Sequence, residues 1–165
     1  MAEIRKATLQ DIPEIHRLAH VIWPLVYDYM ISAEQIKYML NKMYSIESLT
    51  QQFESGHQFF FLEHEHQIHG FASCSKMNEK ASMRLHKLYL HPSAQGNGWG
   101  KLLIQKIFEE AQIQECTQVE LNVNRNNKSI GFYQSLGFVI SQTEDIEIGD
   151  GFFMNDYIMT LPLSA

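Results

Sequence analysis

The stretch R-L-H-K-L-Y-L-H-P-S-A-Q-G-N-G-W-G-K, residues 84–101, carries the strongest structural signal in the chain. Its first part is mostly apolar, stops at Pro92 and predicts a strand; a glycine-rich loop follows, and a helical pattern begins at about Gly98. Glycine lets a backbone turn with positive φ and approach a ligand closely, while the first amides of a helix have no intrahelical partner. Together with the helix dipole, those amides predict an anion site suited to a pyrophosphate.

Two familiar phosphate loops do not fit this stretch, and a plain tight turn remains the alternative. A P-loop needs a hydroxyl residue directly after its lysine, but Leu102 follows Lys101. A dinucleotide fingerprint needs its glycines straight after the strand, whereas the linker 92–95 intervenes. The surrounding sequence must therefore identify the loop.

Two motifs resemble a known family. Gln95, Gly98 and Gly100 form Q-x-x-G-x-G after the strand end L-Y-L-H-P, and residues 126–138 read N-N-K-S-I-G-F-Y-Q-S-L-G-F. Both are similar to motifs of the GNAT superfamily of N-acyltransferases, the second to N-x-x-A-x-x-F-Y-x-x-x-G-F. The resemblance covers nearly the whole chain, though weakly before residue 57.

The resemblance implies a set of residues that bind acetyl-CoA as cosubstrate. In the family the loop amides bind the pyrophosphate, and the end of the preceding strand hydrogen-bonds the pantetheine and the thioester carbonyl. Asn126 either contacts CoA or caps the following helix, and Trp99 is bulkier than the residue usual at its position, which an exposed first helical turn tolerates. The implied cofactor-binding residues are Leu88, Tyr89, Leu90, Gln95, Gly96, Asn97, Gly98, Trp99, Gly100, Lys101, Asn126 and Tyr133.

The same resemblance suggests the catalytic groups. Tyr133 occupies the position of the family's general acid, which would protonate the departing thiolate; packing beside Phe132 is the alternative. Strand alternation places His86 on one face with Leu88 and Leu90, and a histidine that titrates near neutral pH suits removal of a proton from an amine. A purely structural His86 stays open. Arg84 stands where histone-type members carry the glutamate that acts as the general base. The absence of that glutamate weakens the hypothesis of a histone substrate.

Length and composition limit the remaining choices. The 165 residues, 45% of them hydrophobic, predict a single domain, and the resemblance implies that this domain, residues 1–165, is an N-acetyltransferase. Thirteen basic and 19 acidic residues leave a formal charge of −6, which argues against nucleic acid and suits a cationic small substrate. Cys74 and Cys116 lack zinc or disulfide spacing. Without an apolar leader or membrane-length run, the expected location is the cytoplasm, away from membranes; a homodimer is left open.

The periodicity predicts a definite order of elements. A strand at 3–7 precedes a helix capped by Thr8 and ended by Trp23-Pro24, then a helix capped by Ser32 and a short one to about residue 54. Strands follow at 57–64, 68–75, 81–91, 119–123, 138–148 and 152–161, with helices at 98–114 and between Asn126 and Gly137. With the resemblance, this order implies an α/β (α+β) fold with a mixed, mostly antiparallel sheet that splays open at the acetyl-CoA site between the strands at 81–91 and 119–123.

The leading hypothesis is a transferase that moves an acetyl group directly from acetyl-CoA to a primary amine, such as a polyamine. Peptide N-termini, lysine side chains, aminoglycosides and amino acids stay open as acceptors, as do a non-catalytic acyl-CoA sensor and an interaction domain with a vacant loop. Helical aromatics are candidate substrate contacts, with helix packing as the alternative: Trp23, Tyr27, Tyr29 and Tyr38. Acidic residues that would attract a polyamine are Asp28, Glu34, Glu47, Asp145 and Glu147. The His and Glu residues at 63–69 suggest a metal site, but strand alternation splits them between faces and no metal is expected.

Overall fold

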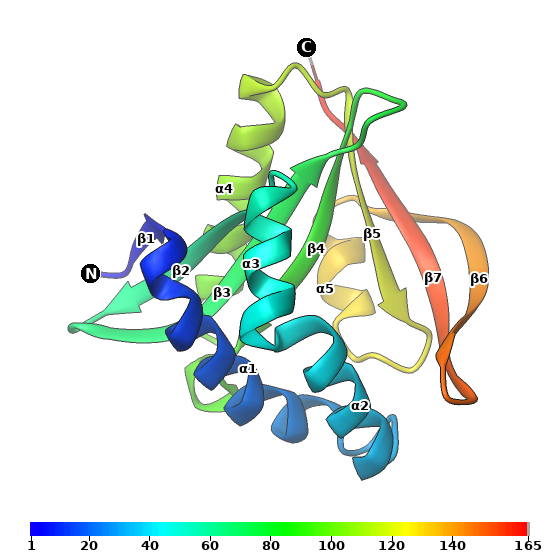
Figure 1. The fold of residues 1–165 in the computed structure, drawn as a ribbon. Helices are drawn as coiled ribbons and strands as arrows, with labels where there is room; N and C mark the ends of the chain where they lie inside the picture. Colours follow the sequence, from blue (N-terminus) through cyan, green and yellow to red (C-terminus); the bar gives the residue numbers. More distant parts are fainter. Residues whose placement is uncertain (165) are drawn as a thin grey trace. The chain divides into compact units, whose positions relative to one another are not determined.

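The computed structural model describes residues 1–164. Two compact units are distinguished along the chain, the first of residues 1–75 and 87–107, the second of residues 76–86 and 108 onward. The helices and strands, labelled in Figure 1, are β1 (Glu3–Lys6), α1 (Ile12–Tyr27), α2 (Ala33–Tyr44), α3 (Ile46–Glu54), β2 (Gln58–His64), β3 (Gln67–Lys76), β4 (Ser82–Leu90), α4 (Trp99–Ile113), β5 (Gln118–Asn124), α5 (Ile130–Ser135), β6 (Val139–Gly149) and β7 (Phe152–Pro162).

The strands are hydrogen-bonded in the order β1-β2-β3-β4-β5-β7-β6. The pairs β1–β2, β2–β3, β5–β7 and β6–β7 are antiparallel, whereas β4 and β5 are parallel. The parallel register joins Ser82–Leu85 to Gln118–Leu121, and from there β4 continues to Leu90 and β5 to Asn124. The predicted fold class, with its mixed and mostly antiparallel open sheet, is confirmed.

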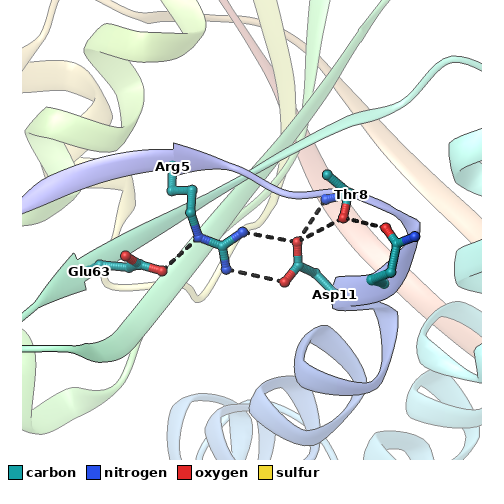
Figure 2. A network of polar contacts seen from close by, with 5 residues as sticks. Arg5, Thr8, Asp11 and Glu63 are labelled. Carbon is teal, nitrogen blue, oxygen red and sulfur yellow. Dashed lines mark hydrogen bonds and ion pairs between the residues drawn. The ribbon is translucent and has the colours of Figure 1, made fainter.

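Arg5 links β1 by hydrogen bonds to β2 and to the turn that precedes α1. Its Nε donates to Glu63 at 2.7 Å, and its two terminal nitrogens donate to Asp11 at 3.0 and 3.1 Å (Figure 2). Asp11 also accepts the backbone NH of Thr8 at 2.8 Å, so a short 3₁₀ turn at Leu9–Asp11 leads into α1. Arg5 lowers the pKa of Asp11 through this bidentate contact. Thr8 caps this 3₁₀ turn and not the first helix as predicted, because the N-cap of α1 is Asp11.

β2 is covered on both faces, which explains its unbroken apolar run. Phe59, Phe60 and Phe61 are all fully buried. Phe59 stacks on Phe53 of α3 with ring centroids 4.9 Å apart, whereas Lys106 of α4 lies 5.6 Å from the Phe60 ring. Each fully buried phenylalanine contributes roughly 1.5–3 kcal/mol, so this strand is a main source of the first unit's stability.

The N-terminal helices follow the predicted caps except at one position. Ser32 accepts from the backbone NH of Gln35 and begins α2, as predicted. The prediction that Trp23-Pro24 ends the first helix was wrong, because α1 continues through Pro24 to Tyr27. A proline inside a helix costs about 3 kcal/mol. Burial of the Trp23 and Tyr27 side chains, 1% and 6% exposed, offsets that cost.

The second unit is built on the antiparallel strands β5, β7 and β6. A tight turn with positive φ at Gly149, Asp150 and Gly151 joins β6 to β7, as the sequence predicts. Phe138 packs between Phe108 of α4 and Tyr133 of α5, with ring centroids at 6.2 and 5.7 Å. Helix α5 is shorter than expected.

Asn126 does not cap that helix. The N-cap of α5 is Ser129, and Gly137, with φ +103°, follows the helix end as predicted. Asn126 instead lies in the preceding turn, where its backbone NH donates to Asn124 Oδ1 at 2.9 Å. The polar side chains of Asn124 and Asn127 satisfy this turn locally and delay the helix start, because Asn127 Oδ1 accepts the NH of Ser129. The alternative of Asn126 as a helix cap is therefore excluded.

Candidate active site

The glycine-rich loop has the backbone that the sequence predicted. Gly96 and Gly98 have φ of +89° and +76°, a region that other L-residues adopt only with strain. A Cβ added at either position would meet no atom within 4 Å, so the glycines are required by conformation and not by crowding. Asn97 Nδ2 donates to the Ala94 carbonyl at 3.3 Å and braces the turn between them. The stretch Gln95–Gly98 is exposed to solvent.

Helix α4 begins directly after this loop, at Trp99. Its first backbone hydrogen bond runs from Leu102 N to the Gly98 carbonyl at 3.2 Å. The amides of residues 99–101 therefore precede the first amide that donates within the helix, and the exposed Lys101 adds a positive charge to the same turn. A loop of this form is an anion cradle, which is the geometry that a pyrophosphate needs.

The end of β4 lies tightly against β3. A Cβ added to Gly70 would fall 2.2 Å from the Tyr89 carbonyl oxygen and 3.0 Å from Leu90 Cα. The His91 NH donates to the His69 carbonyl at 2.9 Å and continues this contact past the strand end. Only glycine fits at position 70, so the backbone over Leu88–Leu90 is held in a fixed place.

The Tyr89 side chain belongs to an aromatic cluster of the first unit. Its hydroxyl lies 2.8 Å from that of Tyr27, and its ring lies 5.7 Å from Trp23 and 5.9 Å from Phe71. Trp23 and Tyr27 are thus core residues, which confirms the packing alternative for these two. Tyr29 is 48% exposed and Tyr38 half-buried, and contact of either with an acceptor stays a prediction.

Trp99 has a structural partner that the sequence did not reveal. Its ring lies 5.0 Å from His64 on β2 and 5.1 Å from His69 on β3. The bulky residue is therefore packed against the β2–β3 hairpin and not merely tolerated on the surface. Glu63 pairs with Arg5, and Glu65 and His66 form the hairpin turn with positive φ. Within residues 1–164, no three His, Cys, Asp or Glu side chains gather as a metal site would require.

The two predicted catalytic residues lie in the second unit. His86 is half-buried on β4, in the predicted alternation with the buried Leu85 and Lys87. Tyr133 on α5 is 7% exposed, and its ring meets Phe132 and Phe138 edge-on at 5.4 and 5.7 Å. Asn126 is exposed in the turn before α5. The glycine-rich loop and the β4 end, residues 88–101, belong to the first unit.

Lys87 is a residue whose environment the sequence did not predict. It is only 5% exposed, and its Nζ donates to Gln52 Oε1 at 2.7 Å while lying 5.4 Å from the Tyr44 ring and 5.5 Å from the Phe59 ring. Burial lowers the pKa of this lysine to about 7. His57 is also affected, since its own burial and then the charge of Lys87 lower the pKa of its imidazole. Strand alternation placed Lys87 opposite His86, but α2 and α3 supply the cover that buries it.

Comparison with known proteins identifies the family. The model of the acetyltransferase (GNAT) domain family matches residues 28–161. The chain belongs to the GNAT acetyltransferase family. As a GNAT N-acetyltransferase it is an enzyme, and the resemblance of the two motifs is confirmed. Within residues 1–164, no helix has both the length and the hydrophobicity needed to cross a membrane.

Individual relatives extend over nearly the whole GNAT chain. A spermidine N(1)-acetyltransferase of Thermoplasma acidophilum is 30% identical over 152 residues, covering 86% of this chain and 91% of the relative. The crystal structure of PaiA N-acetyltransferase from Thermoplasma acidophilum with coenzyme A superposes with a TM-score of 0.82 at 24% identity, covering 99% of both chains. The ribosomal-protein-S18-alanine N-acetyltransferase of Escherichia coli gives 0.75 at 18% identity, covering 100% and 96%. These two structures share the fold.

Proposed function

We propose that this GNAT enzyme transfers an acetyl group from acetyl-CoA directly to a primary amine of a polyamine. The observation that carries the proposal is the 30% identity to a spermidine N(1)-acetyltransferase over 86% of the chain. The formal charge of −6 also favours a cationic acceptor. Residues 1–165 would act as one catalytic domain.

The donor side of the proposal is supported by the loop geometry. Positive φ at Gly96 and Gly98, followed by the first turn of α4, forms a cradle for the CoA pyrophosphate. The relative of known structure at 24% identity was crystallised with coenzyme A. In the proposal, residues 95–101 bind the pyrophosphate, Leu88–Leu90 hold the pantetheine and the thioester, and Asn126 contributes a further CoA contact.

Two side chains handle protons in the proposed reaction. The uncharged amine nitrogen attacks the thioester carbonyl, a C–N bond forms, and the C–S bond breaks as the tetrahedral intermediate collapses. His86 takes the proton that the amine loses, directly or through water, and Tyr133 gives its phenolic proton to the departing thiolate. The half-buried position of His86 and the ring contacts that orient Tyr133 support these roles.

The state of the two cysteines supports a proposal for the cellular location of the enzyme. Cys74 and Cys116 are both buried and outside any disulfide, and burial raises the pKa of the Cys116 thiol. Cysteines that are not joined in a disulfide suit a reducing compartment, and we place the enzyme in the cytoplasm.

A screen of amines tests the proposed acceptor. Purified enzyme with acetyl-CoA is assayed for thiol release with spermidine, n-butylamine, a peptide with an N-terminal alanine, and an L-amino acid. We expect the highest kcat/KM with spermidine. Preference for the peptide or the amino acid would overturn the polyamine assignment, and no turnover with any amine would overturn the catalytic one. The pH profile of His86→Ala then tests the base, because loss of His86 should remove the rise in kcat/KM through neutral pH, and an unchanged profile contradicts that role.

A further inference from the structure

A row of polar side chains crosses three adjacent strands of the second unit. Asn124 on β5 lies directly opposite Asp156 on β7, and Asp156 lies directly opposite Glu144 on β6. Residues in direct register point to the same face of a sheet, so the two carboxyl groups are cross-strand neighbours. Asn122, two residues before Asn124, shares that face and donates its amide to both, at 3.2 Å to Glu144 and 3.4 Å to Asp156.

The direct pairing of Glu144 with Asp156 is unfavourable for the stability of the sheet. Like charges directly opposite each other destabilise a pair of strands, and a charge removed from water needs a counter-charge. Asp156 is only 5% exposed, and its Oδ1 is buried without a hydrogen-bond partner in the described residues. Burial first, and then the neighbouring Glu144, raise the pKa of the Asp156 carboxyl, while the Asn122 hydrogen bond acts in the opposite direction.

Arg84 and Arg125 lower the pKa of Asp156 through space, but neither guanidinium forms an ion pair with Asp156 or Glu144. Arg84 pairs with Glu120 and donates to Asn122 Oδ1. The Arg125 guanidinium pairs with Asp145 at 2.6 Å and reaches Glu144 and Asp156 only through their backbone carbonyls. Over residues 1–164, the side chains of Glu144 and Asp156 form no ion pair with a lysine or arginine. The two carboxyl groups therefore have no directly paired cation within the described residues.

We propose that Asp156 and Glu144 bind a charged, non-reacting ammonium group of the acceptor. An ammonium supplies the counter-charge and donates to Asp156 Oδ1, the oxygen that has no other donor. Glu144 is half-buried and therefore accessible from solvent, whereas Asp156 is buried. The inference rests on the proposed polyamine acceptor and deepens it, since a monoamine has no second ammonium for this pair to bind.

The test compares two acceptors in matched variants. Asp156→Asn keeps the shape of the side chain and removes its charge, Glu144→Gln does the same at the neighbouring position, and Asp150→Asn in the exposed β6–β7 turn is the control. Steady-state kinetics are measured with spermidine and with n-butylamine at saturating acetyl-CoA. We expect Asp156→Asn to raise KM for spermidine about tenfold or more with kcat within a few-fold, since one charged hydrogen bond is lost. Kinetics with n-butylamine, and the control with either acceptor, should not change.

The thermal stability of each variant separates binding from folding. Without acceptor, Asp156→Asn should melt at or above the wild-type Tm, because it removes a like-charge contact; spermidine should raise Tm in the wild type much more than in this variant. An unchanged KM for spermidine in Asp156→Asn, with a wild type that acetylates spermidine, overturns this inference alone. An equal loss with n-butylamine also overturns it, because the residue then serves the fold or the chemistry. A wild type that neither binds nor acetylates spermidine overturns the polyamine acceptor itself, and this inference with it.

Discussion

At the scale of single residues, Lys87 is a side chain whose charge depends strongly on its surroundings. It is held by Gln52 and by the rings of Tyr44 and Phe59, with no carboxylate among these contacts. The pKa of about 7 lies well below the ordinary value of 10.5. Between these two values the unfolded chain holds a proton that the folded chain lacks, so the free energy of unfolding rises as pH increases.

The pH dependence of stability therefore gives a prediction for Lys87→Met. Relative to this variant, the wild type should gain up to about 1.4 kcal/mol of unfolding free energy per pH unit from pH 7 towards 10, and the difference should be flat below pH 7. Urea denaturation of both proteins at several pH values measures it. Lys42→Met, at an exposed position on α2, is the control for the removal of a lysine. A constant difference between wild type and Lys87→Met across this range would mean that Lys87 keeps its charge in the folded chain.

Tyr133 allows a sharper test at the same scale. Tyr133→Phe keeps the ring that packs against Phe132 and Phe138 but removes the hydroxyl. A phenol is protonated at neutral pH, so loss of the proposed acid should lower kcat by about 10² to 10⁴-fold with little change in KM for acetyl-CoA or in Tm. Tyr157→Phe on β7 is the matched control and should retain the wild-type kcat. Near-normal turnover of Tyr133→Phe would refute the acid role, and a large loss of stability would make Tyr133 a packing residue.

At the scale of elements, the junction between β4 and α4 is the best-defined part of the enzyme. Gly70 lets β3 approach the backbone of Tyr89 and Leu90, and Trp99 packs the start of α4 against His64 and His69. These contacts hold both ends of the loop at residues 91–98. A loop fixed at both ends loses little entropy when it binds a ligand.

Gly98→Ala tests the loop as a cofactor site. At φ +76° an alanine costs roughly 1–2 kcal/mol, and its methyl group would project into the open space where the pyrophosphate is proposed to lie. We expect a modest fall in Tm and a rise of about tenfold or more in KM for acetyl-CoA, from weakened hydrogen bonds to the anion. Gly56→Ala has similar strain, with φ +94° and an open Cβ position, and should lower Tm without changing KM. Equal KM values in the two variants would remove the loop from the binding site.

At the scale of the whole molecule, binding of acetyl-CoA should appear as a gain in thermal stability. At about 100 times its dissociation constant, a ligand adds about 2.7 kcal/mol to the free energy of unfolding, which raises Tm by roughly 5–10 °C for a chain of this length. Differential scanning fluorimetry with and without acetyl-CoA measures the shift. Gly98→Ala should show a smaller shift at the same concentration. A wild type with no shift at saturating acetyl-CoA would contradict a working cofactor site.

The sequence alone determined the family, the fold class and the conformation of the glycine-rich loop. The conformation at Gly96 and Gly98, the cap at Ser32, and the periodicity of the strands and helices depend on residues close together in the chain. Such local requirements can be read without coordinates. The motifs at 95–101 and 126–138 then linked this order of elements to one family.

Tertiary structure alone decided the environments that distant segments create. Helix α1 runs through Pro24 because the side chains of Trp23 and Tyr27 are buried, and Lys87 loses its hydration because α2 and α3 cover it. The pairing of Asp156 with Glu144 depends on the register between β6 and β7. Irregularities at two places shift this register. Burial and register arise from packing between residues far apart in sequence. Composition and periodicity therefore do not predict them.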